Sequence, residues 1–284
     1  MELLNFPTSL DCPECGAPCP NSVRNCPTCD NDIGYPNIRY AEFESNYLNE
    51  KYEDILQKFC NNKDSLENQQ KLFDIIKTEA QVVIAVPENY AKSFLINKTS
   101  LYTNYEKLIK SDVRTPSPFK DDSDRYAVGG KIFGNFAEEI IYGALSLNKM
   151  SLYSYGDVFF ILKNVSIEKR TSFLIENSYH FVDNYCNKIR DPLPKGYRST
   201  WKNKEQLVIL KLSEKLNPLF DAEQCKNLLV FQGKDREKDD CIEAHIYGNF
   251  NLYAIDRISF SQKITKKQKR IIKSLAEQHK IEVV

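Results

Sequence analysis

The clearest periodic pattern in the chain lies between residues 241 and 248, where apolar and polar positions alternate one by one. A period of two places successive side chains on opposite faces of a β-strand. One face of the expected strand is apolar and consists of Ile242, Ala244 and Ile246. The other face carries groups that form hydrogen bonds or take part in chemistry, namely Cys241, Glu243, His245 and Tyr247. We therefore expect a strand that buries its apolar face and lines a cleft with its polar face.

Other stretches have the composition of strands buried inside a sheet. Residues 155–163 (YGDVFFILK) are apolar at nearly every position after Asp157, which is typical of a strand covered on both faces. This stretch is expected at the centre of a sheet. Shorter strand-like segments are expected at 81–86, 170–174, 228–231, 253–260 and 281–284.

Between these segments, apolar residues recur every three to four positions, which predicts amphipathic helices. The expected helices span residues 41–61, 64–76, 87–95, 101–109, 126–147, 205–216 and 265–280. Residues 111–124 and 191–204 are rich in proline and charged residues and are expected to be surface loops. The chain thus mixes helices and strands along its whole length.

Composition narrows the class of protein. The chain has 284 residues, of which 42% are hydrophobic and 27% charged, as in ordinary globular proteins of one or two domains. Its formal net charge is zero, so nucleic acid would have to bind at a local basic patch. No apolar run is long enough to cross a membrane, and the N-terminus lacks the pattern of a signal peptide. We therefore expect a cytoplasmic protein that does not bind membranes.

The strongest motif is a pair of CxxC knuckles near the N-terminus. Cys12 and Cys15 form the first knuckle, and Cys26 and Cys29 form the second. Each knuckle directs two thiolates to one point, and two knuckles complete the tetrahedral set of ligands that Zn²⁺ prefers. So short a segment cannot build a core without the metal, so we expect a structural Zn²⁺ and a zinc ribbon. Cys19 lies between the knuckles, lacks a CxxC partner and is expected to be dispensable.

Polar residues gather just after the expected central strand. Arg170, Ser172, Asn177 and Ser178 fall within nine residues of one another. They are candidates for ligand binding, although Arg170 is more commonly explained as a surface arginine and a helix cap explains Asn177–Ser178 equally well. A second candidate is the loop at 191–204, where Trp201 and several basic residues form an aromatic and basic cluster of the kind that contacts nucleotides.

The order of an arginine-bearing strand, a serine-bearing segment and a strand with one glutamate resembles the Arg–Ser–Glu group of mono-ADP-ribosyltransferases. Three segments carry the resemblance, YGDVFFILK, RTSFLIENSYHF and CIEAHIYGNFNL, and they are also similar to uncharacterised toxin-like members of that fold. The resemblance implies an α+β fold with ADP-ribosyltransferase-like split β-sheets, flanking helices and NAD in the cleft between the sheets. It divides the chain into a zinc ribbon (1–40), a helical connecting region (41–98) and a catalytic domain (99–284).

The resemblance also implies roles for individual residues. Glu243 would be the catalytic glutamate, and Arg170 would hold the phosphates of NAD. Cleavage of the bond between nicotinamide and ribose develops an oxocarbenium-like cation, and a fixed carboxylate stabilises such a charge. His245 shares the face of Glu243, and it would orient the glutamate or contact the nicotinamide.

The serine of the group has three possible positions under this resemblance. Ser172 or Ser178 would support the cleft, and the pair Ser199–Thr200 is a competing position. The expected NAD-binding residues are Arg170, Ser172, Asn177, Ser178 and Tyr179.

One position departs from the family pattern. Family members that modify arginine often carry Glu or Gln two residues before the catalytic glutamate, where this chain has Cys241. We therefore expect a macromolecular acceptor other than arginine, either RNA, DNA or a different protein group. The implied role is that of an intracellular toxin or antiphage effector with a neutralising or chaperone partner.

Two alternatives come from different classes of function. In the first, the protein is a non-enzymatic adaptor that binds nucleic acid through its ribbon, the Trp201 region and the basic helix at 265–280. In the second, Glu243 and His245 hydrolyse a nucleotide other than NAD without a metal. NAD turnover separates both alternatives from the transferase hypothesis.

Overall fold

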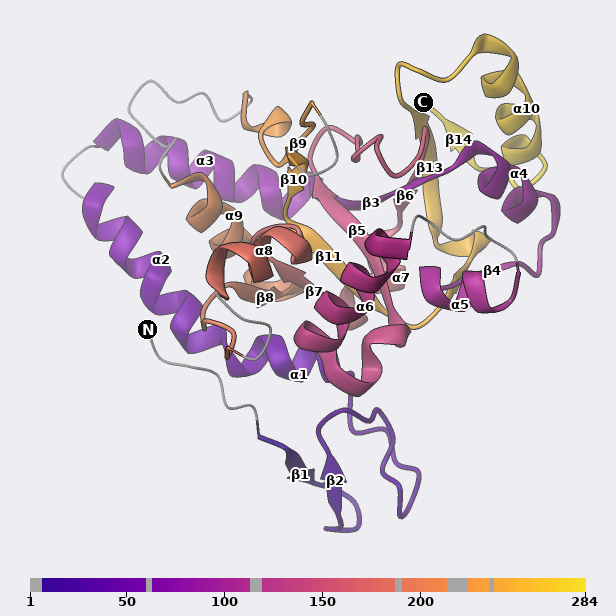
Figure 1. The fold of residues 1–284 in the computed structure, drawn as a ribbon. Coiled ribbons are helices and arrows are strands. Elements are labelled where there is room, and N and C mark those ends of the chain that lie inside the picture. The colour runs from indigo at the N-terminus through magenta and orange to yellow at the C-terminus, as the bar shows by residue number, and fades with distance from the viewer. Residues whose placement is uncertain (1–6, 60–62, 113–118, 187–190, 214–223, 235–237) are drawn as a thin grey trace.

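We analysed a computed structural model of the chain, which describes residues 7–59, 63–112, 119–186, 191–213, 224–234 and 238–284 (Figure 1). A mixed sheet of eight strands runs through the molecule in the order β14-β13-β6-β3-β5-β11-β7-β8. Its strands are β3 (Gln81–Val86), β5 (Ile140–Ser146), β6 (Val158–Leu162), β7 (Thr171–Leu174), β8 (Arg198–Thr200), β11 (Glu243–Tyr247), β13 (Ile255–Phe260) and β14 (Glu282–Val283). All neighbours are antiparallel except β13 and β14, which are parallel.

Three two-stranded sheets accompany the large one. They pair β1 (Ser9–Asp11) with β2 (Pro18–Pro20), β4 (Leu101–Tyr102) with β12 (Phe250–Asn251), and β9 (Val230–Phe231) with β10 (Asp240–Cys241). The first of these belongs to the N-terminal cysteine-rich segment. This segment projects from one end of the molecule and joins it through the first helix (Figure 1).

Helices cover both faces of the sheet. They are α1 (Pro36–Phe43), α2 (Ser45–Phe59), α3 (Lys63–Glu79), α4 (Glu88–Ile96), α5 (Tyr105–Lys110), α6 (Phe119–Phe133), α7 (Asn164–Ile167), α8 (Ser178–Tyr185), α9 (Lys204–Leu212) and α10 (Lys266–Glu277). Helices α2, α3 and α9 pack together at the β8 end of the sheet, and α4 packs on α10 at the β13 end (Figure 1). In the described part of the chain, no helix is both long and apolar enough to span a membrane.

The central position of β6 follows from its composition, as predicted. All five of its residues are buried; Phe159 and Ile161 on one face pack with Met150 and Tyr153 from the segment before the strand, and Phe160 on the other face packs against Phe94 of α4. The apolar face predicted for the strand at 241–248 is fully buried through Ile242, Ala244 and Ile246, but the strand itself spans only Glu243–Tyr247, and Glu243 and His245 on its other face are buried as well. The main core cluster joins the sheet to the surrounding helices, and two smaller clusters around Phe159 and Ala144 lie elsewhere on the sheet.

The predicted helix at 126–147 is wrong in its second half. Helix α6 begins at Phe119, inside the stretch expected to be a loop, and ends at Phe133. A 3-10 helix covers Gly134–Glu139, and Ile140–Ser146 then forms β5. Gly134 has φ of 58°, a left-handed conformation that ends the helix. The helical periodicity of the aromatic residues before Gly134 concealed the strand that follows.

The boundary at residue 98 between a connecting region and a catalytic domain, which the resemblance implies, does not separate two packed units in the structure. Strand β3 comes from the expected connecting region (41–98), yet it lies between β5 and β6 of the expected catalytic domain. Eight of the described strands also form one continuous sheet, whereas the resemblance implies a sheet split into two. Residues 41–98 are therefore part of the same packed unit as the rest of the sheet.

Two further segments differ from expectation. The helix expected at 41–61 is interrupted at Glu44, which separates α1 from α2. The loop expected at 191–204 contributes β8, an edge strand that pairs with β7. Residues 214–216 of the helix expected at 205–216 lie outside the described residues, as does Cys60.

Candidate functional site

The four knuckle cysteines converge on one point in the structure. The Sγ atoms of Cys12, Cys15, Cys26 and Cys29 all lie within 4.8 Å of one another. The Cys12–Cys29 pair is separated by 3.6 Å and the Cys15–Cys26 pair by 3.7 Å. Sulfurs placed about 2.3 Å from a tetrahedral Zn²⁺ are about 3.8 Å apart, so the spacing suits that metal. These four cysteines could therefore hold a metal ion, as the sequence predicts.

Local turns bring the thiolates together. In each knuckle, the backbone closes on its first cysteine, since Gly16 N–H donates to Cys12 O and Asp30 N–H donates to Cys26 O. Gly16 and Asp30 both have positive φ, which lets the chain reverse just after the second cysteine of each knuckle. Cys19 is fully buried and packs against Cys12 and Cys26, but its thiol donates to Ala17 O and it is not one of the four converging cysteines.

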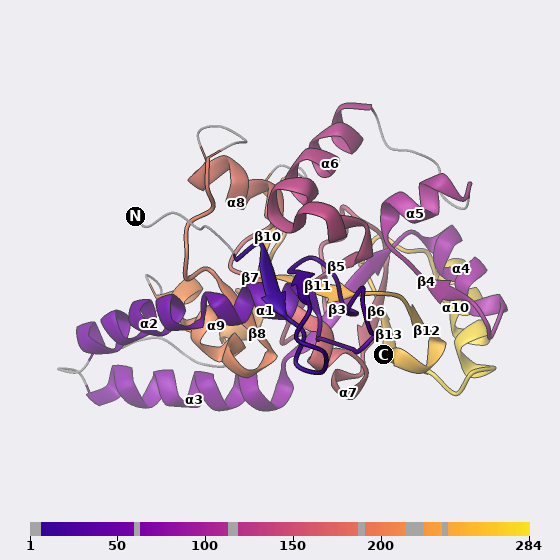
Figure 2. The same cartoon turned by 90° about the horizontal axis from the view of Figure 1, so that it is seen from below.

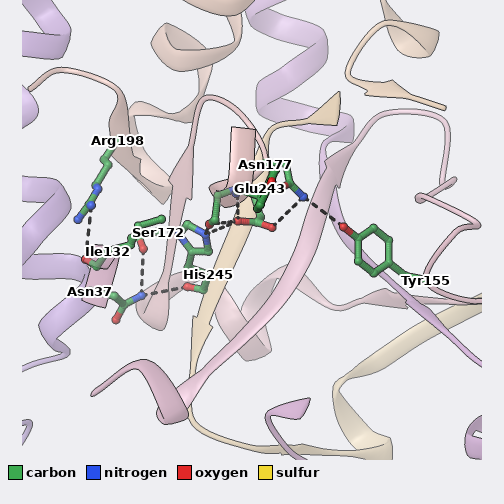
Figure 3. A network of polar contacts seen from close by, with 10 residues as sticks. Asn37, Ile132, Tyr155, Ser172, Asn177, Arg198, Glu243 and His245 are labelled. Atoms are coloured by element: carbon green, nitrogen blue, oxygen red, sulfur yellow. Dashed lines mark hydrogen bonds and ion pairs between the residues drawn. The ribbon is translucent and has the colours of Figure 1, made fainter. Parts of the chain in front are cut away.

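A second site surrounds Glu243 at the centre of the sheet (Figure 3). Its carboxylate accepts a hydrogen bond of 3.0 Å from the backbone N–H of Ser178, the first residue of α8. The Ser178 hydroxyl donates to the same carboxylate oxygen, and His245 Nε2 lies 2.9 Å from it. Asn177 Nδ2 donates to the other oxygen at 3.5 Å. Glu243 thus lies at the N-terminus of α8, where the helix dipole favours a negative charge.

The register of the sheet explains why these groups meet. Glu243 and His245 are two residues apart on β11, so their side chains project from the same face. Helix α8 begins four residues after β7 ends, and β7 is the neighbour of β11. The turn between them is capped by Asn177, whose Oδ1 accepts from Tyr179 N–H. The cap therefore aims Ser178 and the Asn177 amide at Glu243.

His245 occupies an apolar and aromatic environment. Only 1% of its surface is exposed, and its ring packs edge-on against Phe133 and Tyr142 at 4.7 and 5.5 Å. Burial lowers the pKa of His245, although the neighbouring Glu243 raises it and Arg198 lowers it slightly further. The imidazole is therefore held in its neutral form at physiological pH, and it acts as a hydrogen-bond partner of Glu243.

We expect the free energy of unfolding of the wild type to decrease, relative to His245→Gln, as pH falls below about 6.5. Because the folded-state pKa of His245 is lowered, the unfolded chain takes up the proton first. The stability associated with the neutral ring is complete above about pH 6.5, and it falls by up to about 1.4 kcal/mol per pH unit below it. Urea unfolding between about pH 8 and about pH 5 measures this difference. His180→Gln, on α8, is the control, and parallel curves for wild type and His245→Gln would contradict a buried neutral ring.

Two tyrosines complete the surroundings of Glu243. The Tyr155 hydroxyl accepts a hydrogen bond of 3.4 Å from Asn177 Nδ2, and Tyr142 lies opposite His245 on β5. Burial raises the pKa of both phenols well above the usual value, and the charge of Glu243 raises it further. Both hydroxyls therefore stay protonated beside Glu243.

Glu243 differs from the other buried glutamates in its partners. Glu44 pairs with Arg198 at 3.4 Å, and Glu205 pairs with Lys204 at 2.6 Å. Within the part of the chain that the structure describes, no lysine or arginine forms an ion pair with Glu243. Its side chain retains 10% exposure, and the hydrogen bonds to both of its carboxylate oxygens are buried. A buried carboxylate without a cationic partner is costly for a fold, and such groups are common at functional sites.

Arg170 does not join Glu243. Its guanidinium donates to the backbone carbonyls of Tyr247, Gly248 and Asn249 at 2.5, 3.0 and 3.1 Å. These carbonyls lie at and just beyond the far end of β11, where Tyr247 is separated from Glu243 by about 13 Å along the strand. Its contacts are those of a residue that holds the β11–β12 turn, which argues against the phosphate-binding role implied by the resemblance.

The structure distinguishes between the three positions expected for the serine of the Arg–Ser–Glu group. Ser178 contacts Glu243, whereas the Ser172 hydroxyl accepts from Asn37 and is 3% exposed. Ser199 and Thr200 lie on β8, separated from β11 by β7. Tyr179, next to Ser178, is 45% exposed. The serine that supports the glutamate is therefore Ser178, with Tyr179 at the surface beside it.

The nucleotide-contacting role expected of the Trp201 loop is not supported. Trp201 packs against Phe173 of β7 at 5.5 Å, so the ring contributes to the core. Arg198 and Lys204 are both 3% exposed and form ion pairs with buried glutamates. Two of the positive charges expected at this surface are therefore neutralised inside the protein.

The polar face of β11 is covered, whereas the sequence predicts that it lines a cleft. Helices α6 and α8 supply Phe133 and Ser178, which contact His245 and Glu243. Cys241, expected beside the acceptor, is 2% exposed and belongs to β10. Sequence reasoning missed Asn37, Tyr142 and Tyr155, because no motif or local periodicity marks them and only the folded chain brings them near Glu243 or His245.

Comparison with known proteins assigns the chain to no family. No protein-family model matches it, and no curated protein matches its sequence significantly. Interpretation of the two sites therefore rests on their geometry and on the resemblance of three short segments.

Proposed function

We propose that this protein is an NAD-dependent ADP-ribosyltransferase that uses Glu243 to cleave the bond between nicotinamide and ribose. The observation that supports this most directly is the Glu243 carboxylate itself, which is buried, held by neutral donors and without a lysine or arginine partner among the described residues. A carboxylate of this kind keeps its negative charge available for a cation that develops during a reaction.

The chemistry requires little else from the protein. The bond between ribose C1′ and the nicotinamide nitrogen breaks, and nicotinamide leaves as a neutral molecule with the bonding electrons. The ribose is left as an oxocarbenium-like cation, which a nearby carboxylate stabilises. A nucleophile of the acceptor then bonds to C1′ and loses its proton, for which Glu243 is the proposed base. The leaving group needs no proton, so one glutamate is enough.

The neighbours of Glu243 have positioning roles in this proposal. Ser178 fixes one carboxylate oxygen through its backbone and side chain, and neutral His245 contacts the same oxygen without cancelling its charge. Asn177 links the second oxygen to the Tyr155 hydroxyl. For NAD binding, we propose Tyr179 as an exposed aromatic surface beside the site, and we no longer assign the phosphates to Arg170.

A direct test uses NAD labelled in its ADP-ribose part. The purified full-length protein is incubated with labelled NAD and a cell extract, and release of nicotinamide is followed with transfer of label to protein, RNA or DNA. Transfer supports the proposal and identifies the class of macromolecular acceptor. If the zinc-loaded protein consumes no NAD, the non-enzymatic adaptor becomes the better explanation.

We further propose that the four-cysteine cluster holds a structural Zn²⁺. We expect about one zinc per chain in the wild type and in Cys19→Ser, and a loss of most of it in Cys26→Ser. Cys26 supplies one of the four converging sulfurs, whereas the Cys19 thiol bonds to a carbonyl outside the cluster. Elemental analysis of the purified proteins measures the ratio. Equal zinc loss in the two variants would contradict this ligand set.

A further inference from the structure

Helix α1 lies between the cysteine-rich ribbon and the strand that carries Glu243 and His245. In the view from below, the ribbon lies beside α1, in front of the middle of the sheet (Figure 2). The helix packs on β7 and β8. Two of its polar residues, Asn37 and Arg39, point to opposite sides of the helix, because residues two positions apart are separated by about 200° around its axis.

Asn37 binds the strand pair at the site. Its side chain is 1% exposed, and Nδ2 lies 3.0 Å from His245 O, 3.1 Å from Arg170 O and 3.2 Å from Ser172 Oγ. His245 and Ser172 are directly opposite each other on β11 and β7. A single buried amide therefore holds the two strands at the position of the His245 ring (Figure 3).

Arg39 binds the ribbon. Its guanidinium donates five hydrogen bonds of 2.6 to 2.9 Å, all to uncharged oxygens of ribbon residues. The acceptors are Asn21 O, Asn21 Oδ1, Val23 O, Ile33 O and Gly34 O. They flank Cys26 and Cys29, two of the four converging cysteines, on both sides in sequence. The position of these oxygens therefore depends on the fold that the metal stabilises.

An aromatic contact joins the same two parts a second time. The Tyr35 ring, at the end of the ribbon, lies 5.5 Å from the Tyr247 ring at the end of β11. Arg24, on the ribbon, stacks on Tyr35 at 4.5 Å and pairs with Asp32. The ribbon thus reaches β11 both through α1 and directly.

We infer that Asn37 and Arg39 are positioning residues through which the metal-loaded ribbon holds the Glu243–His245 strand in place. The folded ribbon holds the oxygens that accept hydrogen bonds from Arg39, and these bonds fix the position of α1. Asn37 on α1 in turn holds β11 against β7. Coupling between two sites is reciprocal in binding free energy. Loss of the metal should loosen β11, and loss of the Arg39 contacts should weaken metal binding. For activity, this inference rests on the proposed function, but its main test does not.

The test compares wild type, Arg39→Met and Arg270→Met as full-length, zinc-loaded proteins. Met keeps the apolar stem of Arg39 without its donors, and Arg270 is an exposed arginine on α10 that serves as the control. Amide hydrogen exchange of β11 and β7 is measured before and after chelation, with β6 as the internal reference. Emission of Trp201, the only tryptophan, gives a second readout because its ring packs on Phe173 of β7. Zinc affinity is measured by competition with a chelator.

In wild type and Arg270→Met, we expect zinc removal to speed exchange in β11 and β7 about tenfold or more, with little change in β6, and to shift Trp201 emission. In Arg39→Met, exchange in β11 should be fast even with zinc bound, chelation should add little, and zinc affinity should fall about tenfold. Asn37→Ser should also speed β11 exchange while the ribbon amides stay protected. Unchanged β11 exchange in wild type after chelation, or wild-type behaviour of Arg39→Met, would overturn the inference. Neither result depends on NAD cleavage, so failure of the proposed function remains distinguishable.

Discussion

Glu243→Gln should fold as the wild type does and cleave NAD about a hundredfold more slowly or worse. The substitution keeps the shape of the side chain and an oxygen that accepts from the N–H and hydroxyl of Ser178. It removes the negative charge that the proposal assigns to the oxocarbenium-like cation. A hundredfold loss corresponds to about 2.7 kcal/mol of transition-state stabilisation. The measurement is nicotinamide release at saturating NAD by protein shown to be folded and zinc-loaded.

The matched control is Glu176→Gln. Glu176 is close in sequence to the N-terminus of α8, but its carboxylate bonds to Asn184 and takes no part in the Glu243 contacts. It should retain wild-type turnover. Wild-type turnover in Glu243→Gln itself would remove the enzymatic proposal in its present form and favour the adaptor hypothesis. Loss of turnover in both variants would point to a general effect of charge near α8.

Arg198→Ala should lower the free energy of unfolding by about 3 to 5 kcal/mol. Arg198 and Glu44 are 3% and 0% exposed, and the Glu44 carboxylate also accepts from the backbone N–H groups of Gly196 and Tyr197. The substitution leaves Glu44 as a buried charge without its cation, in the break between α1 and α2. Urea unfolding followed by circular dichroism measures the loss.

Two further variants make this stability test specific. Lys110→Ala breaks an exposed pair with Glu138, in which the side chains are 63% and 40% exposed, and should cost less than about 1 kcal/mol. The double variant Glu44→Gln with Arg198→Met removes both charges and should recover much of the stability lost in Arg198→Ala. A cost for Arg198→Ala no larger than that for Lys110→Ala would contradict a buried, coupled pair.

The Arg198 pair also explains an error in the sequence interpretation. Residues 191–204 resemble a solvated basic loop because the composition of a segment does not show where its charges go. In the folded chain, Arg198 pairs with Glu44, which lies in the distant break between α1 and α2. Lys204 pairs with its neighbour Glu205, and its Nζ lies 5.4 Å from the Trp201 ring centre. Burial of these two cations in ion pairs makes an apparent binding surface part of the core.

Local patterns were enough for the features whose interactions are local. The two CxxC knuckles predict the cluster of four cysteines, because each ligand pair is set by a turn of a few residues. The alternation at 241–248 predicts the buried face of β11, since successive side chains of any strand point to opposite faces. The apolar run in β6 predicts its central place in the sheet for the same kind of reason.

Tertiary structure alone decided which residues meet. Strand β5 formed where helical periodicity suggested a continuing helix, since pairing with β3 and β11 outweighs local preference. The contact of Ser178 with Glu243 depends on the start of α8 beside β11, and Arg170 was carried to the other end of that strand. Asn37 reached His245 across more than two hundred residues of sequence. Such contacts depend on the order of the strands and the placement of the helices, which local periodicity does not predict. Local sequence patterns therefore determined many of the elements and their buried faces, whereas the tertiary structure decided which side chains form the site.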